Sequence, residues 1–371
     1  MTARAGAVGN GAIDVHSHVI PPEVVAAMEA DPTALMARIE ETGSGRVVRH
    51  DQGYVYPLLD EFVDPVVKLR VMDDKRLAVS VVSPPPPLFF YWLDPRLGIE
   101  TARLVNDGIA AMVAVAPDRP RGVATIPMAD PEAAIAEIDR VVETHGFRAI
   151  EVGTSIEGEQ LAAPRFRPVP RRALELGVLV LAHPYYVGSK AGLEDYYLTN
   201  LVGNPLDTTV MVAHLMFSGA LDELDALDLC VAHGGGYAPY ALGRLQHGHR
   251  VREEPRRYTS SSPRALLRRL RFDTITFSAP ALGYLVDRVG ADRLLLGSGA
   301  PFDMAMTIRS RRSTRSRGSA NATAPPSCAA TPSGCSARRI RPASPSFGIV
   351  LGAGGGRPIR CRIQPVAAIA I

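Results

Sequence analysis

AIDVHSH, at residues 12–18, is a short apolar run that ends in two histidines placed two positions apart. Seven runs of similar length follow it: LAVSVVS (77–83), GVATIPM (122–128), AIEVGTS (149–155), VLVLAHP (178–184), LDLCVAH (227–233), TITFSAP (274–280) and RLLLGSG (293–299). Their nearly continuous apolar character is typical of parallel strands that are buried on both faces. Eight such strands are what a closed parallel barrel requires.

Helical patterns separate these runs. Between residues 131 and 145 apolar side chains recur at helical spacing, and Asp130 is placed as an N-cap; residues 101–115 show a similar pattern. Alternating strands and helices predict an α/β fold, so we expect a (β/α)8 TIM-like barrel. Residues 19–76 are less regular, and we expect them to form a small insert after the first strand, over the barrel mouth.

The charge distribution divides the chain into two parts. The chain has 41 basic and 38 acidic residues, and residues 305–371 hold eleven arginines with no Asp, Glu or Lys, which leaves 30 basic against 38 acidic residues, a net charge of −8, in residues 1–304. We therefore predict a barrel over 1–304 and an Arg/Ser/Pro-rich tail over 305–371 without the expected closing helix. An Arg-rich tail could bind nucleic acid. The abrupt loss of acids and lysines favours a disordered or out-of-frame end instead, so nucleic acid is not expected as a partner.

Cysteine usage and hydropathy bear on the environment of the protein. Three of the four cysteines lie in the tail and the body keeps only Cys230, so no disulfide framework is expected and a cytoplasmic location is predicted. The most apolar long stretch, residues 201–221, is interrupted by polar residues and a proline. It is therefore expected to be a buried or interface helix, and no membrane association is predicted.

Four histidines stand at the carboxyl ends of expected strands: His16 and His18 on the first, His183 on the fifth and His233 on the sixth. In a parallel barrel these ends meet on one face, where active sites form. Residues two positions apart on a strand point to the same side, so His16 and His18 could share a divalent ion. The alternative is that these histidines are merely polar residues satisfied in the barrel mouth.

The motifs, taken in order, resemble the amidohydrolase-related family. They are IDVHSH near the start, LAHP after the fifth strand, VAHGGG after the sixth, and LLLGS followed two residues later by PF after the eighth. Within that family the chain is most similar to the aminocarboxymuconate semialdehyde decarboxylase branch, from about Ile13 to Met304. The resemblance implies a metal-dependent TIM-barrel enzyme.

The resemblance also implies roles for particular residues. His16, His18 and His183 match the family's histidine ligands, usually to zinc, and His233 matches the histidine that handles a proton near the metal. Arg252 matches an arginine that binds a substrate carboxylate from the partner subunit of a dimer. A guanidinium group suits a carboxylate, and an imidazole titrates near neutral pH.

The chain departs from the family pattern at two site positions. The family has an aspartate ligand after the eighth strand where this chain has Gly299, and Asp303 is a poor substitute because a loop or cap role is expected for it. The decarboxylase branch has an arginine where this chain has Tyr56, so the substrate is expected to differ. Loss of the aspartate puts activity in doubt, although three histidines and water can satisfy zinc.

We therefore predict a zinc-dependent (or other divalent-metal) decarboxylase that acts on a small carboxylated catabolite, in a homodimeric barrel. A hydrolase on the same scaffold is the alternative, because one barrel supports many chemistries. A third possibility is a catalytically impaired barrel that binds a metabolite or partner. Release of carbon dioxide against cleavage of esters or amides separates the three.

Overall fold

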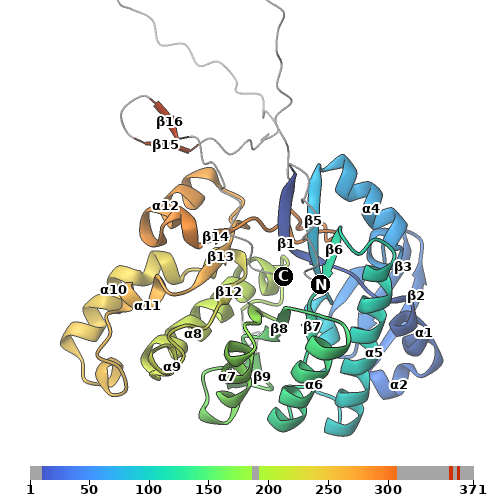
Figure 1. The fold of residues 1–371 in the computed structure, drawn as a ribbon, viewed down its shortest axis with the longest axis horizontal. Coiled ribbons are helices and arrows are strands. Elements are labelled where there is room, and N and C mark those ends of the chain that lie inside the picture. Colours follow the sequence, from blue (N-terminus) through green and yellow to red (C-terminus); the bar gives the residue numbers. More distant parts are fainter. Residues whose placement is uncertain (1–10, 186–191, 307–350, 354–356, 360–371) are drawn as a thin grey trace, which may run out of the picture.

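The computed structural model describes residues 11–185, 192–306, 351–353 and 357–359 (Figure 1). Its centre is a barrel of eight parallel strand positions. In chain order these are β1 (Ala12–His18), β5 (Leu77–Ser83), β6 with β7 (Pro120–Gly122 and Ala124–Thr125), β8 (Ala149–Gly153), β11 (Leu179–His183), β12 (Leu229–Val231), β13 (Arg271–Asp273) and β14 (Leu294–Leu295). The predicted (β/α)8 barrel is confirmed.

The barrel closes where its last strand meets its first. Neighbouring strands pair in parallel from β1 through β5 to β6, and from β7 through to β14. The amide of Val123 donates to Val82 O at 2.9 Å and joins the two groups of strands. At the other seam, Val15 N donates to Leu296 O and His18 N to Ala300 O, both at 2.7 Å. The carboxyl ends of all eight strands therefore face one side.

Helices surround the strands. The main ones are α5 (Pro95–Ala114), α6 (Pro131–Thr144), α7 (Pro168–Glu175), α8 (Asn204–Phe217), α10 (Ala238–Val251) and α12 (Ala279–Val289); shorter ones are α9 (Ala220–Glu223) and α11 (Pro263–Leu267). The predicted cap at α6 is present, because the Asp130 carboxylate accepts hydrogen bonds from the amides of Glu132 and Ala133. None of the helices in the described ranges is long and apolar enough to cross a membrane.

The insert after the first strand is more regular than the sequence suggests. It contains α1 (Pro22–Ala30), α2 (Pro32–Leu35), α3 (Asp60–Val63) and α4 (Pro65–Asp74), together with an antiparallel sheet of β2 (Ala37–Thr42), β3 (Gly45–His50) and β4 (Val55–Pro57). The end of this sheet reaches the barrel mouth, because residues 53–57 line the pocket there. The insert therefore supplies part of the wall of the site.

The seventh strand is displaced from its expected position. We expected residues 274–280, but β13 spans Arg271–Asp273, and the apolar run after it forms a turn that leads into α12. The apolar pattern did not indicate this strand because two of its three residues, Arg271 and Asp273, are charged. Arg271 forms an ion pair with Asp228, and the buried Asp273 is hydrogen-bonded. Charged side chains that are satisfied in this way can occupy a buried strand.

An apolar layer fills the barrel below the strand ends. It consists of Val15, Val81, Val123, Ala149, Leu179, Leu181, Cys230 and Leu295. Polar side chains begin above it, as at His16 and His183.

Part of the predicted tail is also described: β15 (Leu351–Ala353) and β16 (Arg357–Ile359) form a two-stranded antiparallel sheet. The rest of residues 307–371, and therefore most of the tail prediction, lies outside the described residues.

Candidate metal centre

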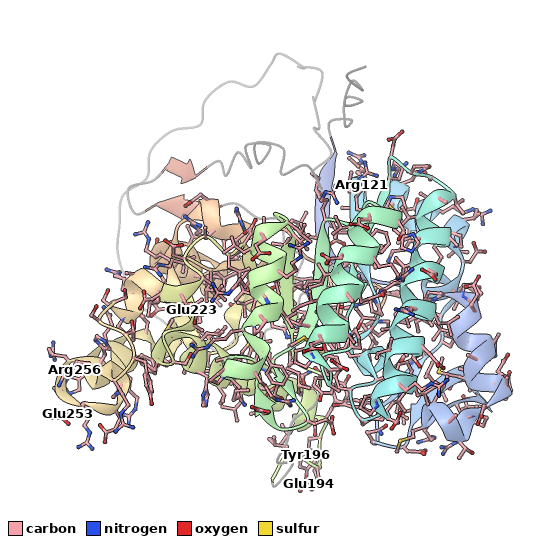
Figure 2. The ribbon with its side chains drawn as sticks, turned by 60° about the horizontal axis from the view of Figure 1, so that its bottom comes forward. Arg121, Glu194, Tyr196, Glu223, Glu253 and Arg256 are labelled. Atoms are coloured by element: carbon pink, nitrogen blue, oxygen red, sulfur yellow. The ribbon has the colours of Figure 1, made fainter. Side chains whose placement is uncertain are left out.

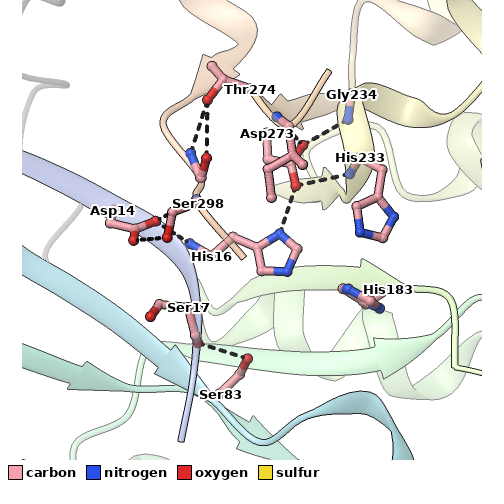
Figure 3. A network of polar contacts seen from close by, with 12 residues as sticks. Asp14, His16, Ser17, Ser83, His183, His233, Gly234, Asp273, Thr274 and Ser298 are labelled. Atoms are coloured by element: carbon pink, nitrogen blue, oxygen red, sulfur yellow. Dashed lines mark hydrogen bonds and ion pairs between the residues drawn. The ribbon is translucent and has the colours of Figure 1, made fainter. Parts of the chain in front are cut away.

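Three histidines from β1 and β11 lie together at the carboxyl end of the barrel. His16, His18 and His183 are 1%, 1% and 6% exposed, and their candidate ligand atoms lie within 4.8 Å of one another. The Nε2 atoms of His16 and His18 are 3.2 Å apart. Figure 3 shows the rings of His16 and His183 turned toward the same space as that of His233.

The other ring nitrogen of each histidine faces an acceptor. Nδ1 of His16 lies 2.7 Å from Asp273 Oδ2, Nδ1 of His18 lies 3.2 Å from Pro84 O, and Nδ1 of His183 lies 2.7 Å from Pro184 O. A proton on each Nδ1 leaves each Nε2 with a lone pair. Burial holds the pKa of His18 and of His183 well below the usual range, so both rings are neutral near pH 7. Asp273 raises the pKa of His16, so a metal ion bound at its Nε2 would displace the second proton of that ring. Three imidazoles that each direct Nε2 into one space are a donor set that fits a divalent transition metal.

A buried lysine supports the strand that carries two of these histidines. Nζ of Lys68, on α4, lies 2.6 Å from Ser17 Oγ, between His16 and His18 in the sequence. The same ammonium group forms an ion pair with Glu61 at 3.1 Å. The ion pair compensates for the burial of the charge, and the hydrogen bond to Ser17 holds β1 against α4.

His233 follows β12 and faces the same space. Its ring centroid is 4.8 Å from that of His183 and 5.9 Å from that of His16. Its backbone has a φ of 56°, and three glycines with positive φ follow it. The Nδ1 atom is buried without a hydrogen-bond partner in the described part of the chain. Burial, with a smaller contribution from His16, lowers the pKa of His233 to about 4 against the opposing charge of Asp273.

Two buried carboxyl groups near the histidines were not identified from the sequence. Asp273 is hydrogen-bonded to His16, and Glu151 on β8 is fully buried, two residues before the partner of His183 in the strand register. Burial raises the pKa of Glu151 to about 8, so this group is largely protonated at neutral pH. A charged residue inside an expected strand, as in AIEVG, was the available signal for Glu151. Asp273 was overlooked because the seventh strand was placed too late.

Gly299 leaves the eighth strand without a ligand side chain. Its φ is 72°, and a Cβ added there would meet only Ile275 Cδ1, at 3.5 Å. Gly299 also lines the pocket, so a side chain at this position would enter it. Asp303, the substitute considered above, is exposed and accepts a hydrogen bond from Met304 N at 2.8 Å, which is a local loop contact.

The histidines open into a pocket of about 1140 Å³. Its inner wall is aromatic: Phe302 lies 5.3 Å from the ring of His18 and 5.7 Å from that of Tyr56. The hydroxyl of Tyr56 is 3.1 Å from His50 Nε2, so its hydrogen-bonding capacity is engaged inside the protein. Among the described lining residues there is no lysine or arginine, and the two acidic ones are Glu194 and Asp303.

Arg252 lies outside this pocket in the single chain. It caps the carboxyl end of α10, its side chain is 67% exposed, and it forms an ion pair with Glu254. Figure 2 shows the neighbouring residues Glu253 and Arg256 at one edge of the molecule, away from Glu194 and Tyr196. Within one subunit the structure therefore brings together His16, His18, His183 and His233, but not Arg252.

Comparison with known proteins gives this arrangement a family. The model of the amidohydrolase family matches residues 13–306. The chain belongs to the amidohydrolase family. It is similar to 2-amino-3-carboxymuconate-6-semialdehyde decarboxylase of Dictyostelium discoideum, with 28% identity over 80% of this chain and 83% of the relative.

Solved structures of other proteins share the fold. The IDCase of Metarhizium anisopliae in its apo form superposes with a TM-score of 0.70 at 23% identity, covering 80% of this chain and 86% of that one. A dihydroxybenzoic acid decarboxylase of Polaromonas sp., with bound manganese and the inhibitor 2-nitroresorcinol, has a TM-score of 0.64 at 23% identity, covering 79% and 87% of the two chains. The resemblance inferred from the sequence motifs is confirmed.

Proposed function

We propose that this protein is a metal-dependent decarboxylase of a small carboxylated substrate, with His16, His18 and His183 as metal ligands. The observation that carries the proposal is the set of three convergent imidazoles at the base of a large pocket, each with Nδ1 facing an acceptor. The Dictyostelium relative is a decarboxylase, which supports this activity. Zinc and manganese are both candidates, because zinc favours histidine nitrogen and the Polaromonas decarboxylase binds manganese.

A divalent cation bound by the three histidines would supply Lewis-acid charge beside a substrate oxygen. His233 would handle the proton. Decarboxylation breaks the bond between a carbon and its carboxylate, carbon dioxide leaves, and the electron pair left on that carbon takes up a proton. The neutral ring of His233, with Nδ1 unpartnered at the pocket wall, could accept a proton from substrate or water and return it to that carbon.

The pocket wall favours a flat, unsaturated or aromatic substrate. Phe302 packs edge-on against both His18 and Tyr56, and rings of this kind pack well against a planar ligand. Because the hydroxyl of Tyr56 is bonded to His50, Tyr56 contributes its ring rather than a free donor. No basic side chain in the described lining could pair with a carboxylate distant from the metal.

We infer that Arg252 of a second copy supplies the missing cation in a homodimer. Arg252 is exposed and outside the pocket of its own chain. Exposed apolar side chains are present on η3 (Thr199–Gly203) and α8, and they offer a face for a second subunit: Leu201, Val202, Leu206 and Val210. Leu201 also lines the pocket, so a subunit packed on this face would stand at its mouth.

A cytoplasmic location is proposed from cysteine usage alone, because the one described cysteine, Cys230, is buried and unpaired.

The test measures metal content and reaction type on the same preparation. Purified protein is expected to hold close to one divalent ion per chain and to release carbon dioxide from a hydroxylated benzoate or an unsaturated dicarboxylate. His183→Ala should lose both metal and turnover, whereas His145→Ala is the matched control because His145 pairs with Asp107 on the outer helices. Cleavage of esters or amides without carbon dioxide release would point to a hydrolase. Metal binding without either reaction would refute the catalytic proposal.

A further inference from the structure

Asp273 is the most completely hydrogen-bonded side chain in the described part of the site. It ends β13 and is 0% exposed. Its Oδ2 atom accepts from His16 Nδ1 at 2.7 Å and from the backbone amide of His233 at 2.9 Å. Its Oδ1 atom accepts from the amides of Gly234 at 2.8 Å and Ile275 at 3.1 Å. One carboxylate thus joins three segments of the barrel mouth (Figure 3).

These four contacts exclude Asp273 as a metal ligand in this conformation. An ionised carboxylate has about four lone-pair sites, and each oxygen of Asp273 already accepts two hydrogen bonds. The group of residues whose ligand atoms converge on one point contains the three histidines and not Asp273. Its role must therefore be exerted through the groups that it holds.

The first of these groups is the ring of His16. With Nδ1–H donating to the carboxylate, Nε2 keeps its lone pair and is directed toward His18 and His183. A carboxylate behind a ligating imidazole fixes its tautomer and increases its basicity. Without this partner the ring could rotate, or could carry its proton on the nitrogen that the metal needs.

The second group is the turn that carries His233. A non-glycine residue at positive φ is strained and needs support from its surroundings. His233 has a φ of 56° and Gly234 one of 60°, and Asp273 accepts the amide hydrogens of both residues. The carboxylate therefore stabilises the backbone conformation that directs the His233 ring into the pocket.

We propose that Asp273 is the positioning residue of this centre, because its single carboxylate sets both the ring of the metal ligand His16 and the turn that presents His233. The inference rests on the proposed metal site but not on the reaction that occurs there. Metal affinity and the placement of the proton-transfer group are then fixed by the same side chain, and a change at Asp273 should alter both together.

The first test is Asp273→Asn. The amide keeps one acceptor oxygen and turns an NH2 group toward two of the former donors, so about half of the contacts are lost. We expect the dissociation constant for zinc or manganese, measured by competition with a chromophoric chelator, to rise about 10–100-fold. At saturating metal, kcat should still be reduced and its pH profile displaced, because the His233 turn is no longer held.

Asp228→Asn is the matched control, since Asp228 is tied to the opposite end of the same strand through Arg271. It should alter stability without changing the metal dissociation constant by more than about threefold. A folded Asp273→Asn protein that binds metal as tightly as the wild type, with an unchanged pH profile, would overturn the proposal. Metal binding that is weakened equally in both variants would do the same, because the effect would then be general destabilisation.

A measurement on the unmodified protein keeps the proposal testable if Asp273→Asn does not fold. In nitrogen-15 spectra of histidine-labelled protein, recorded at a pH where the ring of His16 is neutral, His16 should be the Nδ1–H tautomer, with the strongly deshielded proton of an imidazole bonded to a carboxylate. An Nε2–H tautomer, or an unbonded Nδ1 proton, would overturn the inference. Failure of the decarboxylation assay with this tautomer in place would refute the proposed reaction and leave the role of Asp273 intact.

Discussion

β1 and β14 are neighbours in the barrel but contribute differently to the site. β1 is seven residues long and carries His16 and His18, whereas β14 has two residues and is followed by a segment that offers backbone groups and one serine. Gly299 N donates to His16 O at 2.8 Å, and Ser298 Oγ donates to Asp14 Oδ2 at 2.6 Å. The eighth strand therefore positions the first strand without adding a ligand.

The difference shows that different groups close the barrel and bind the metal: backbone hydrogen bonds close the barrel, and side chains supply the ligands. The backbone bonds between β1 and the segment after β14 do not depend on the side chain at position 299. A glycine there leaves the fold intact while it removes any donor from that side. The site then depends on three histidines and on the groups that hold them.

The largest effect, on metal affinity, is expected from removing a histidine of β1. His18→Ala should weaken zinc or manganese binding by at least about 100-fold, because even partners outside the ligand set are worth about 10–100-fold. Chelator competition measures this change, with His145→Ala as the control on the outer helices. Affinity within a few fold of the wild type would mean that His18 is a polar residue of the mouth and not a ligand.

The pH dependence of stability should also reflect the buried histidines. Their folded pKa lies below the unfolded value of about 6.5, well below it for His18 and His183 and at about 4 for His233. Below pH 6.5 these histidines are protonated in the unfolded chain but remain neutral in the folded protein. The unfolding free energy of the metal-free protein should therefore fall between pH 6.5 and about 4, by roughly 1.4 kcal/mol per pH unit for each such group.

His16 opposes this trend in part, because the hydrogen bond and charge of Asp273 outweigh burial and raise its pKa. Its contribution is present at low pH and is lost as the pH rises through its folded pKa. Urea titrations at pH 7.0, 5.5 and 4.5 measure the net slope. The slope should be smaller in His18→Ala, and a flat profile in the wild type would contradict the burial of neutral histidines.

A smaller effect, on the free energy of unfolding, is expected from removing the hydrogen bond between Ser298 and Asp14, which links β1 to the segment after β14. Ser298→Ala leaves Asp14 Oδ2 buried without its hydroxyl partner, and a group left unsatisfied in this way is destabilising by about 1–3 kcal/mol. Denaturant titration measures the loss. Ser44→Ala, in an exposed turn of the insert, is the control and should change stability by less than about 0.5 kcal/mol.

The smallest change should come from giving the eighth strand a ligand. Gly299→Asp would place a carboxylate in the pocket, and we expect metal to bind about tenfold more tightly, or about 1.4 kcal/mol. Stability should not improve, because aspartate is strained at a φ of 72°. Gly299→Asn has the same shape without the charge and is the matched control. Equal affinity in glycine, asparagine and aspartate forms would show that the site does not use this position.

The sequence determined the barrel and the histidine cluster. Short apolar runs alternating with amphipathic segments are sufficient to predict a parallel barrel, and in such a fold a residue's place at the end of a strand fixes which face it reaches. His16, His18, His183 and His233 could therefore be grouped without coordinates. β1 and β5 were placed residue for residue.

Tertiary structure alone decided what surrounds the histidines. Asp273 belongs to the site because it is satisfied by amides 39 and 40 residues earlier in the chain and by a ring 257 residues earlier, and no local pattern encodes those contacts. The place of Arg252 outside the pocket likewise depends on where α10 ends in space. Hydrophobic periodicity reports which face of an element is buried. The partners of a buried charge depend on chain segments that meet only when the barrel closes.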